Sequence, residues 1–321
     1  MQDGSHSPTI GQILDRVYRL MKANLRGFLG LAIVPTGCAV VLLVTMLAAM
    51  FLVVFRGQWP TPSASPAVAA DPAVLAALTF VMVLMYLGYM MVFAIYQPAA
   101  SYAALQADVG IAVPFREAYA FAWNRAGRYI GLFLLRLLIV SGPILGAILV
   151  LGSALLIAVT LDRDSAQTAF LAIIPLLILV YAGGMVYGIF MMIRLALANP
   201  ACVAEDLTVR AAIRRSFELS RQAKGRIFLV ALVVYAAIYA AMMVCELIFG
   251  FVASVVAFPM VLMEASQTAV IVAVVAGAVL LVAAMLLVSA ASSAAYATAF
   301  AVLYRDQRLR VDAKPEAGIA N

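Results

Sequence analysis

Hydrophobic residues occur along this chain in six long runs, and shorter segments between the runs carry most of the charged residues. A helix needs about 20 consecutive apolar residues to cross the hydrocarbon core of a bilayer, and each run reaches that length. A transmembrane β-barrel would show short strands of alternating polarity, and the sequence has none. The pattern therefore predicts an all-α polytopic integral membrane protein with transmembrane helices over roughly residues 27–55, 73–97, 129–160, 168–193, 227–262 and 268–301.

The composition excludes a water-soluble domain, whose residues are typically about one quarter charged. Here 66% of the 321 residues are hydrophobic, 11% are charged, and the mean hydropathy is +1.09. The first apolar run follows a charged segment of 26 residues and is about twice the length of a signal-peptide core. We therefore expect this run to be a retained first span.

The basic residues indicate an orientation. Four Lys and Arg precede residue 27, three lie between Arg116 and Arg128, seven between Arg194 and Arg226, and four after Tyr304. The opposite loops hold only Arg56 and Arg163. Because Lys and Arg concentrate in cytoplasmic loops, both termini and the two basic connections are predicted to be cytoplasmic.

The densest basic segment, "TVRAAIRRSFELSRQAKGRIF" at 208–228, has the pattern of an amphipathic helix. We expect it to lie flat at the cytoplasmic interface. One interpretation is that its charges only set the topology. The other is that they bind anionic lipid head groups, and the two can both be true. The head-group candidates are Arg210, Arg214, Arg215 and Arg221.

Two further segments resemble this one and suggest an internal repeat. Residues 9–26 begin with Thr9 and Gln12, which fit a capping box, and residues 115–131 form a weaker copy. The repeat unit would be an interfacial amphipathic helix followed by a hairpin of two spans, over about 9–107, 111–206 and 207–310. Chance matches in a chain rich in Ala, Leu and Val are the alternative. We expect one membrane domain over 9–310, with mobile tails at 1–8 and 311–321.

Two ionisable residues, Arg136 and Glu246, lie inside the predicted spans. Charged groups inside a membrane are functional candidates because their desolvation is costly. Both can instead reach an interface by snorkelling. Counted along the helices at about 1.5 Å per residue, they lie at different depths, so a direct ion pair is not expected.

Small residues and prolines give packing signals inside the spans. Gly142 with Gly146, and Gly184 with Gly188, have the spacing that allows close helix contact. Four prolines are expected to kink or end their helices: Pro35, Pro98, Pro143 and Pro259.

The sequence gives no sign of catalytic chemistry. It contains no glycine-rich phosphate loop, zinc-ligand spacing or nucleophile elbow. The single histidine, His6, lies in the predicted N-terminal tail, and the three cysteines are not paired in spacing. We expect a non-enzymatic protein that uses no cofactor or metal ion and binds no nucleic acid.

Three segments resemble the membrane-domain family named after prokaryotic glycerophosphoryl diester phosphodiesterases. They are "TIGQILDRVYRLMKANLRGFL" at 9–29, "NPACVAEDLTVRAAIRRSFELSRQAKGRIF" at 199–228 and "AVLYRDQRLR" at 301–310. The resemblance implies a prokaryotic inner-membrane location. It implies no hydrolase activity, because the chain has no room for the soluble catalytic barrel of some members. The matched positions are Pro200, Glu205, Ala212, Ser216, Leu219, Tyr304, Asp306, Arg308 and Arg310.

Three functions are compatible with these features. The first is a membrane module that binds or moves lipid or another amphiphile, with the basic residues at head groups. The second is a scaffold or anchor for a protein partner that docks on the same cytoplasmic surface. The third, a secondary transporter that uses Arg136 and Glu246, is disfavoured because few polar residues mark a site at the membrane midplane.

Overall fold

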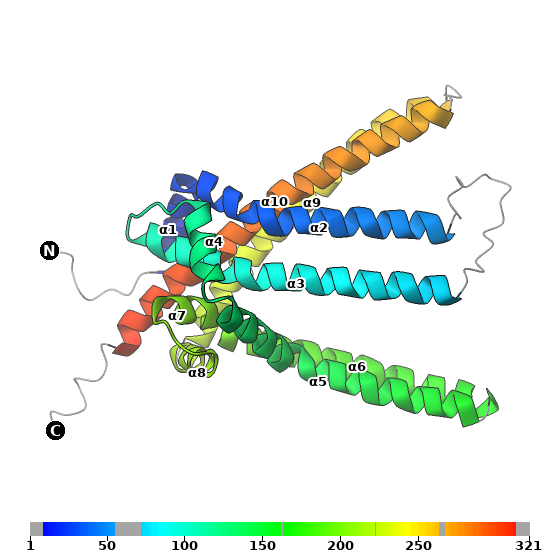
Figure 1. Ribbon diagram of the computed structural model, residues 1–321, viewed down its shortest axis with the longest axis horizontal. Coiled ribbons are helices and arrows are strands. Elements are labelled where there is room, and N and C mark those ends of the chain that lie inside the picture. Colours follow the sequence, from blue (N-terminus) through cyan, green and yellow to red (C-terminus); the bar gives the residue numbers. More distant parts are fainter. Residues whose placement is uncertain (1–8, 55–71, 162, 222, 263–266, 313–321) are drawn as a thin grey trace. The chain divides into compact units, whose positions relative to one another are not determined.

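The computed structural model describes residues 9–54, 72–161, 163–221, 223–262 and 267–312 (Figure 1). These residues form helices and contain no strand, which confirms the predicted all-α class. The predicted N-terminal tail at 1–8, with His6, and residues 313–321 of the predicted C-terminal tail at 311–321 lie outside the described residues. The helices are α1 (Ile10–Ala23), α2 (Leu25–Val54), α3 (Pro72–Asp108), α4 (Phe115–Trp123), α5 (Ala126–Leu161), α6 (Arg163–Leu195), α7 (Ala198–Ala204), α8 (Val209–Ser220), α9 (Lys224–Leu262) and α10 (Gln267–Asp312).

Six of the described helices are long and apolar enough to cross a membrane: α2, α3, α5, α6, α9 and α10. They coincide with the six predicted runs, and this fits a multi-pass membrane protein. Two of them continue past the predicted ends, α3 to Asp108 and α10 to Asp312. Residues 311 and 312, which we expected in the C-terminal tail, are therefore helical.

The prolines do not end helices. Pro35, Pro98 and Pro143 lie inside α2, α3 and α5, and Pro259 falls within the bounds of α9. We expected each of these prolines either to kink or to end its helix, and the expectation of a helix end is wrong. A long apolar helix in a membrane tolerates proline because neighbouring groups or local adjustments satisfy the carbonyl that loses its partner.

The chain divides into two compact units. Unit 1 comprises Met1–Asn124 and Val230–Val302, and unit 2 comprises Arg125–Leu229 and Leu303–Asn321. In unit 1, α2 and α3 form a hairpin, and α4 packs against both helices. The Tyr119 hydroxyl of α4 donates to the carbonyl of Leu31 at 2.6 Å. A Cβ atom added at Gly30 would lie 3.0 Å from the ring of Phe115, so α4 packs closely on α2.

The N-terminal helix of unit 1 begins as the sequence predicts. The Thr9 amide donates to the side-chain oxygen of Gln12 at 2.8 Å, and the Gln12 amide donates to the Thr9 hydroxyl at 3.3 Å. This reciprocal pair is the expected capping box and satisfies two amides at the helix start. Ile13 and Val17 are buried, and Arg19 on the same helix is exposed.

In unit 2, α5 and α6 form a hairpin, and α8 packs against both of its helices. A Cβ atom added at Gly131 in α5 would lie 3.4 Å from the side chain of Val209 in α8. A short helix thus lies across the preceding hairpin in each unit, α4 in unit 1 and α8 in unit 2. This is the order that the repeat hypothesis requires, and the repeat itself stays a prediction.

At Gly184, α6 packs closely against α5. A Cβ atom there would overlap Cγ1 of Ile144, whereas one at Gly188 would lie 3.9 Å from Val140. The other predicted pair does not make such a contact. Among the described residues, a Cβ atom at Gly142 would meet only Leu138 of its own helix, and one at Gly146 would meet nothing within 4 Å.

Gly184→Ala is therefore expected to lower the free energy of unfolding by about 1–3 kcal/mol, because the new methyl group overlaps the stiff, β-branched Ile144 side chain. Gly183→Ala is the matched control, since its Cβ atom would meet nothing within 4 Å. The control should be neutral or stabilising because alanine is the better helix former. Unfolding in mixed detergent micelles measures both variants, and equal losses would contradict the close contact at Gly184.

Candidate functional site

The family-like central segment forms α7, a sharp turn and α8 in unit 2. Pro200 is buried in α7, and the amide of Glu205, which follows α7, donates to the carbonyl of Ala201 at 3.0 Å. Asp206 then has a positive φ of 49°, a left-handed conformation that Asp tolerates better than most residues. The turn ends α7 and lets α8 begin at Val209.

The carboxylate of Asp206 connects this turn to the start of α5. The guanidinium of Arg128 donates to the Asp206 carboxylate and, at 3.2 Å, to its backbone carbonyl. The Arg125 guanidinium lies 3.4 Å from the same carboxylate. These ion pairs are exposed, so their contribution to stability is small.

Glu205 is the centre of a more enclosed group. Its carboxylate accepts a hydrogen bond from the Tyr304 hydroxyl of α10 at 2.7 Å and one from Nε of Arg215 in α8 at 3.2 Å. Nε of Arg308 lies 3.8 Å away. We call Glu205, Arg215, Tyr304, Arg308 and Asp312 the Glu205 cluster. It joins the end of α7 to α8 and to the last turns of α10.

Arg215 is held on two sides within this cluster. Its guanidinium donates to both carboxylate oxygens of Asp312, at 2.8 and 3.1 Å, and only 20% of the side chain is exposed. Burial lowers the pKa of Arg215, but the hydrogen bonds to Asp312 and Glu205 outweigh it and raise the pKa above its ordinary value. Arg215 is therefore permanently charged and neutralised by carboxylates of its own chain.

A second cluster surrounds Asp306, whose side chain is 10% exposed. Its carboxylate lies 3.3 Å from the Arg226 guanidinium of α9 and 3.1 Å from Nε of Arg310. It also accepts a hydrogen bond from the side-chain amide nitrogen of Gln307 at 3.0 Å. We call Asp306, Arg226, Gln307 and Arg310 the Asp306 cluster. It fixes the first turn of α9 against α10.

Ser216 anchors α8 to the end of α6. The buried Ser216 hydroxyl donates at 2.7 Å to the carbonyl of Arg194, one of the last carbonyls of α6. Because the last carbonyls of a helix have no partner inside that helix, this hydrogen bond satisfies a group that would be costly to bury alone. The Arg194 guanidinium lies 4.5 Å from the centre of the Phe217 ring, a cation–π distance.

The other candidate arginines, Arg210 and Arg214 of α8 and Arg221 at its C-cap, face away from these clusters. At 100° per residue, Arg210, Arg214 and Arg221 fall within about 40° of one another on the helix surface. All three are exposed, and the Arg214 side chain is 80% exposed, with Glu218 at 3.8 Å. Within the described residues, Arg210 and Arg221 have no acidic partner. We call these three residues the arginine stripe.

The two intramembrane candidates lie in different helices and different units. Arg136 in α5 is half-buried and interacts with another group of the protein. Glu246 in α9 is exposed. The geometry brings neither residue into the Glu205 cluster, the Asp306 cluster or the arginine stripe.

The structure thus joins six of the family-like polar positions to the two clusters or to a helix end. Glu205, Tyr304 and Arg308 belong to the Glu205 cluster, Asp306 and Arg310 belong to the Asp306 cluster, and Ser216 bonds to the end of α6. Sequence analysis missed three cluster members, Arg226, Gln307 and Asp312. The spacing of four residues between Arg308 and Asp312 is a local signal that could have identified Asp312. No local signal connects Arg226 with Asp306, which lie far apart along the chain.

Comparison of the chain with protein-family models, with curated proteins and with solved structures finds no match. The resemblance to the phosphodiesterase-associated membrane domain therefore stays a prediction. In the Glu205 cluster and the Asp306 cluster, acids are paired with arginines. The arginine stripe adds an exposed row of cations.

Proposed function

We propose that the protein is a non-enzymatic integral membrane protein that binds anionic lipid head groups through the arginine stripe of α8. The observation that carries the proposal is the division of the arginines of α8. Arg215 is neutralised by Glu205 and Asp312, whereas Arg210, Arg214 and Arg221 present their charges on one exposed face. In this proposal α8 lies at the cytoplasmic interface of a prokaryotic inner membrane.

Electrostatics supports this assignment. An Arg or Lys near an anionic membrane surface contributes about 1 kcal/mol of binding free energy, so three exposed arginines contribute about 3 kcal/mol, or roughly 100-fold in affinity. Arginine also forms bidentate hydrogen bonds with phosphate. Ser216 and the Glu205 cluster hold α8 against the rest of unit 2, so the stripe is presented on a fixed helix.

The double variant R210Q/R221Q tests the proposal. It removes the two arginines without an acidic partner and should lower the affinity for phosphatidylglycerol about 30-fold, while binding of zwitterionic phosphatidylethanolamine changes little. Native mass spectrometry of the detergent-purified protein, titrated with each lipid, measures both affinities.

R19Q/R116Q is the matched control, because it removes the same charge from exposed side chains of α1 and α4. It should keep near wild-type affinity for phosphatidylglycerol. Equal affinities in R210Q/R221Q, the control and the wild type would overturn lipid binding at the stripe. The same surface would then be examined for a protein partner, which is the scaffold function.

A further inference from the structure

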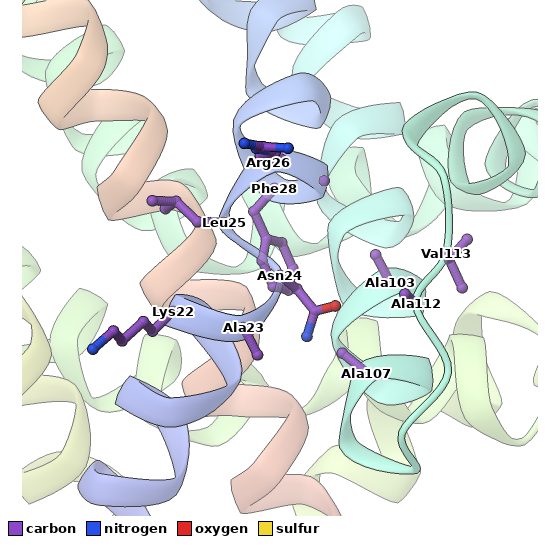
Figure 2. A pocket seen from close by; sticks show the side chains of 11 residues that line it. Lys22, Ala23, Asn24, Leu25, Arg26, Phe28, Ala103, Ala107, Ala112 and Val113 are labelled. Carbon is purple, nitrogen blue, oxygen red and sulfur yellow. The ribbon is translucent and has the colours of Figure 1, made fainter.

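A cavity in unit 1 lies where α1 meets α2, beside the end of α3 (Figure 2). Its volume is about 540 Å³. Figure 2 shows Asn24 and Phe28 on one side and Ala103 and Ala107 of α3 on the other. Lys22 and Arg26 border the cavity and are exposed, and no acidic residue lines it. Figure 2 shows the Lys22 side chain extending away from Ala103 and Ala107. The cavity has the charge and the polar groups to take an anion.

The acid nearest to this cavity along α3, Asp108, does not neutralise its cations. The Asp108 carboxylate lies 2.7 Å from the guanidinium of Arg16, and its side chain is only 1% exposed. Lys22 and Arg26 therefore keep their charge available to a ligand.

A second cavity of about 470 Å³ lies between α2 and α3. It is lined mainly by apolar groups, among them Ile33, Cys38 and Val41 of α2 and Met85 of α3, with two glycines, Gly37 and Gly88, that leave space. A Cβ atom at either glycine would meet nothing within 4 Å. This crevice has the chemistry to hold an acyl chain.

Both cavities are lined by α2 and α3, and the residues of α3 that line them fall on one face of that helix. On α2, Arg26 and Gly37 are separated by about three turns and lie within about 20° of each other. On α3, Ala103 and Met85 are separated by about five turns and point in the same direction. The distance along α2 from Arg26 to Gly37 is about 16 Å, close to the depth of about 15 Å of one leaflet of the hydrocarbon core.

We infer that one anionic phospholipid occupies both cavities, with its phosphate at Lys22 and Arg26 and an acyl chain in the crevice between α2 and α3. The ligand class rests on the proposed function, but the site lies in unit 1 and uses none of the residues of α8. The positive charge of the first cavity favours a phosphate group. The second cavity is apolar and long enough for an acyl chain, so the two together favour a phospholipid over free phosphate.

The test measures phosphatidylglycerol that stays bound through detergent washing, by native mass spectrometry. The wild type should retain one tightly bound molecule per chain that inorganic phosphate in excess does not displace. K22Q/R26Q should lower its affinity about 30-fold, since two cations are removed. G37L/G88L should also lose the lipid, because the leucines fill the crevice.

There are two matched controls. R19Q removes an exposed cation of α1 that pairs with Asp15 at 2.7 Å. Gly183→Leu adds a leucine at a glycine where an added Cβ atom would have no neighbour within 4 Å. Both should retain the lipid. R210Q/R221Q should retain this molecule too. Failure of lipid binding at the arginine stripe can therefore be distinguished from failure of lipid binding at the two cavities. If K22Q/R26Q and G37L/G88L both retained as much lipid as the wild type, the lipid at the two cavities would be annular. If inorganic phosphate displaced the bound molecule, the crevice would not hold an acyl chain. Either result overturns the inference.

Discussion

Glu205→Gln is expected to lower the free energy of unfolding by about 2–3 kcal/mol. Removing one partner of a fully buried ion pair costs about 3–5 kcal/mol, and the cost is smaller here because the Glu205 and Arg215 side chains remain 17% and 20% exposed. Glutamine keeps an acceptor for the Tyr304 hydroxyl but removes the charge that faces Arg215 and Arg308. Unfolding in mixed detergent micelles, followed by circular dichroism, measures the loss.

Glu218→Gln is the control for this experiment. Glu218 lies on the same helix, but its side chain is 51% exposed, and its ion pairs with Arg214 and Arg215 are long, at 3.8 and 3.7 Å. Exposed pairs of this kind contribute about 0.3–0.5 kcal/mol, so the control should change stability little. Comparable losses in the two variants would show that the Glu205 cluster does not hold α7, α8 and α10 together.

Asp306→Asn is expected to have a similar effect, again about 2–3 kcal/mol. The Asp306 carboxylate is 10% exposed and faces two guanidinium groups, those of Arg226 and Arg310. Asparagine would remove the carboxylate charge that faces both cations. The same unfolding experiment measures this variant, with a further expectation that protease cleavage near the start of α9 becomes faster.

Asp15→Asn serves as the control for Asp306, since the Asp15 side chain is 60% exposed and pairs with Arg19 one helical turn away. Its loss should cost less than about 0.5 kcal/mol. A loss for Asp306→Asn as small as this control's would mean that Arg226 and Arg310 find other partners.

The helices were predictable because their signal is local. Each span is a continuous apolar run, and hydropathy alone identifies it. The ends of α3 and α10 were predicted too early because hydropathy falls where the polar segments begin. The last turns of α10 persist past that point, supported by ion pairs at a spacing of four residues, between Asp306 and Arg310 and between Arg308 and Asp312.

The clusters were not predictable from local pattern because their members come from distant segments. Glu205 and Tyr304 are 99 residues apart and meet only when α7 and α10 are in place. The family resemblance marked both residues without indicating that they touch. Asp312 was assigned to a tail, although it is the acid closest to Arg215 among the described residues.

The four arginines of α8 looked equivalent in the sequence, and the helix geometry separates them. Arg215 lies about 100° around the helix from Arg214, on the side that leads to the buried Leu219. It therefore reaches acids of its own chain, while the arginine stripe stays exposed. A helical wheel shows this boundary position, but only the structure supplies Glu205 and Asp312 as partners.

The most direct test of the account is to compare R215Q with R210Q/R221Q in two measurements, the unfolding free energy and the affinity for phosphatidylglycerol. The account predicts opposite results. R215Q should lose stability and keep the lipid affinity of the folded protein, and R210Q/R221Q should keep stability and lose about 30-fold in affinity. If R215Q lost the lipid as strongly as R210Q/R221Q, or if R210Q/R221Q were the destabilised variant, the division between structural and lipid-binding arginines in α8 would be contradicted.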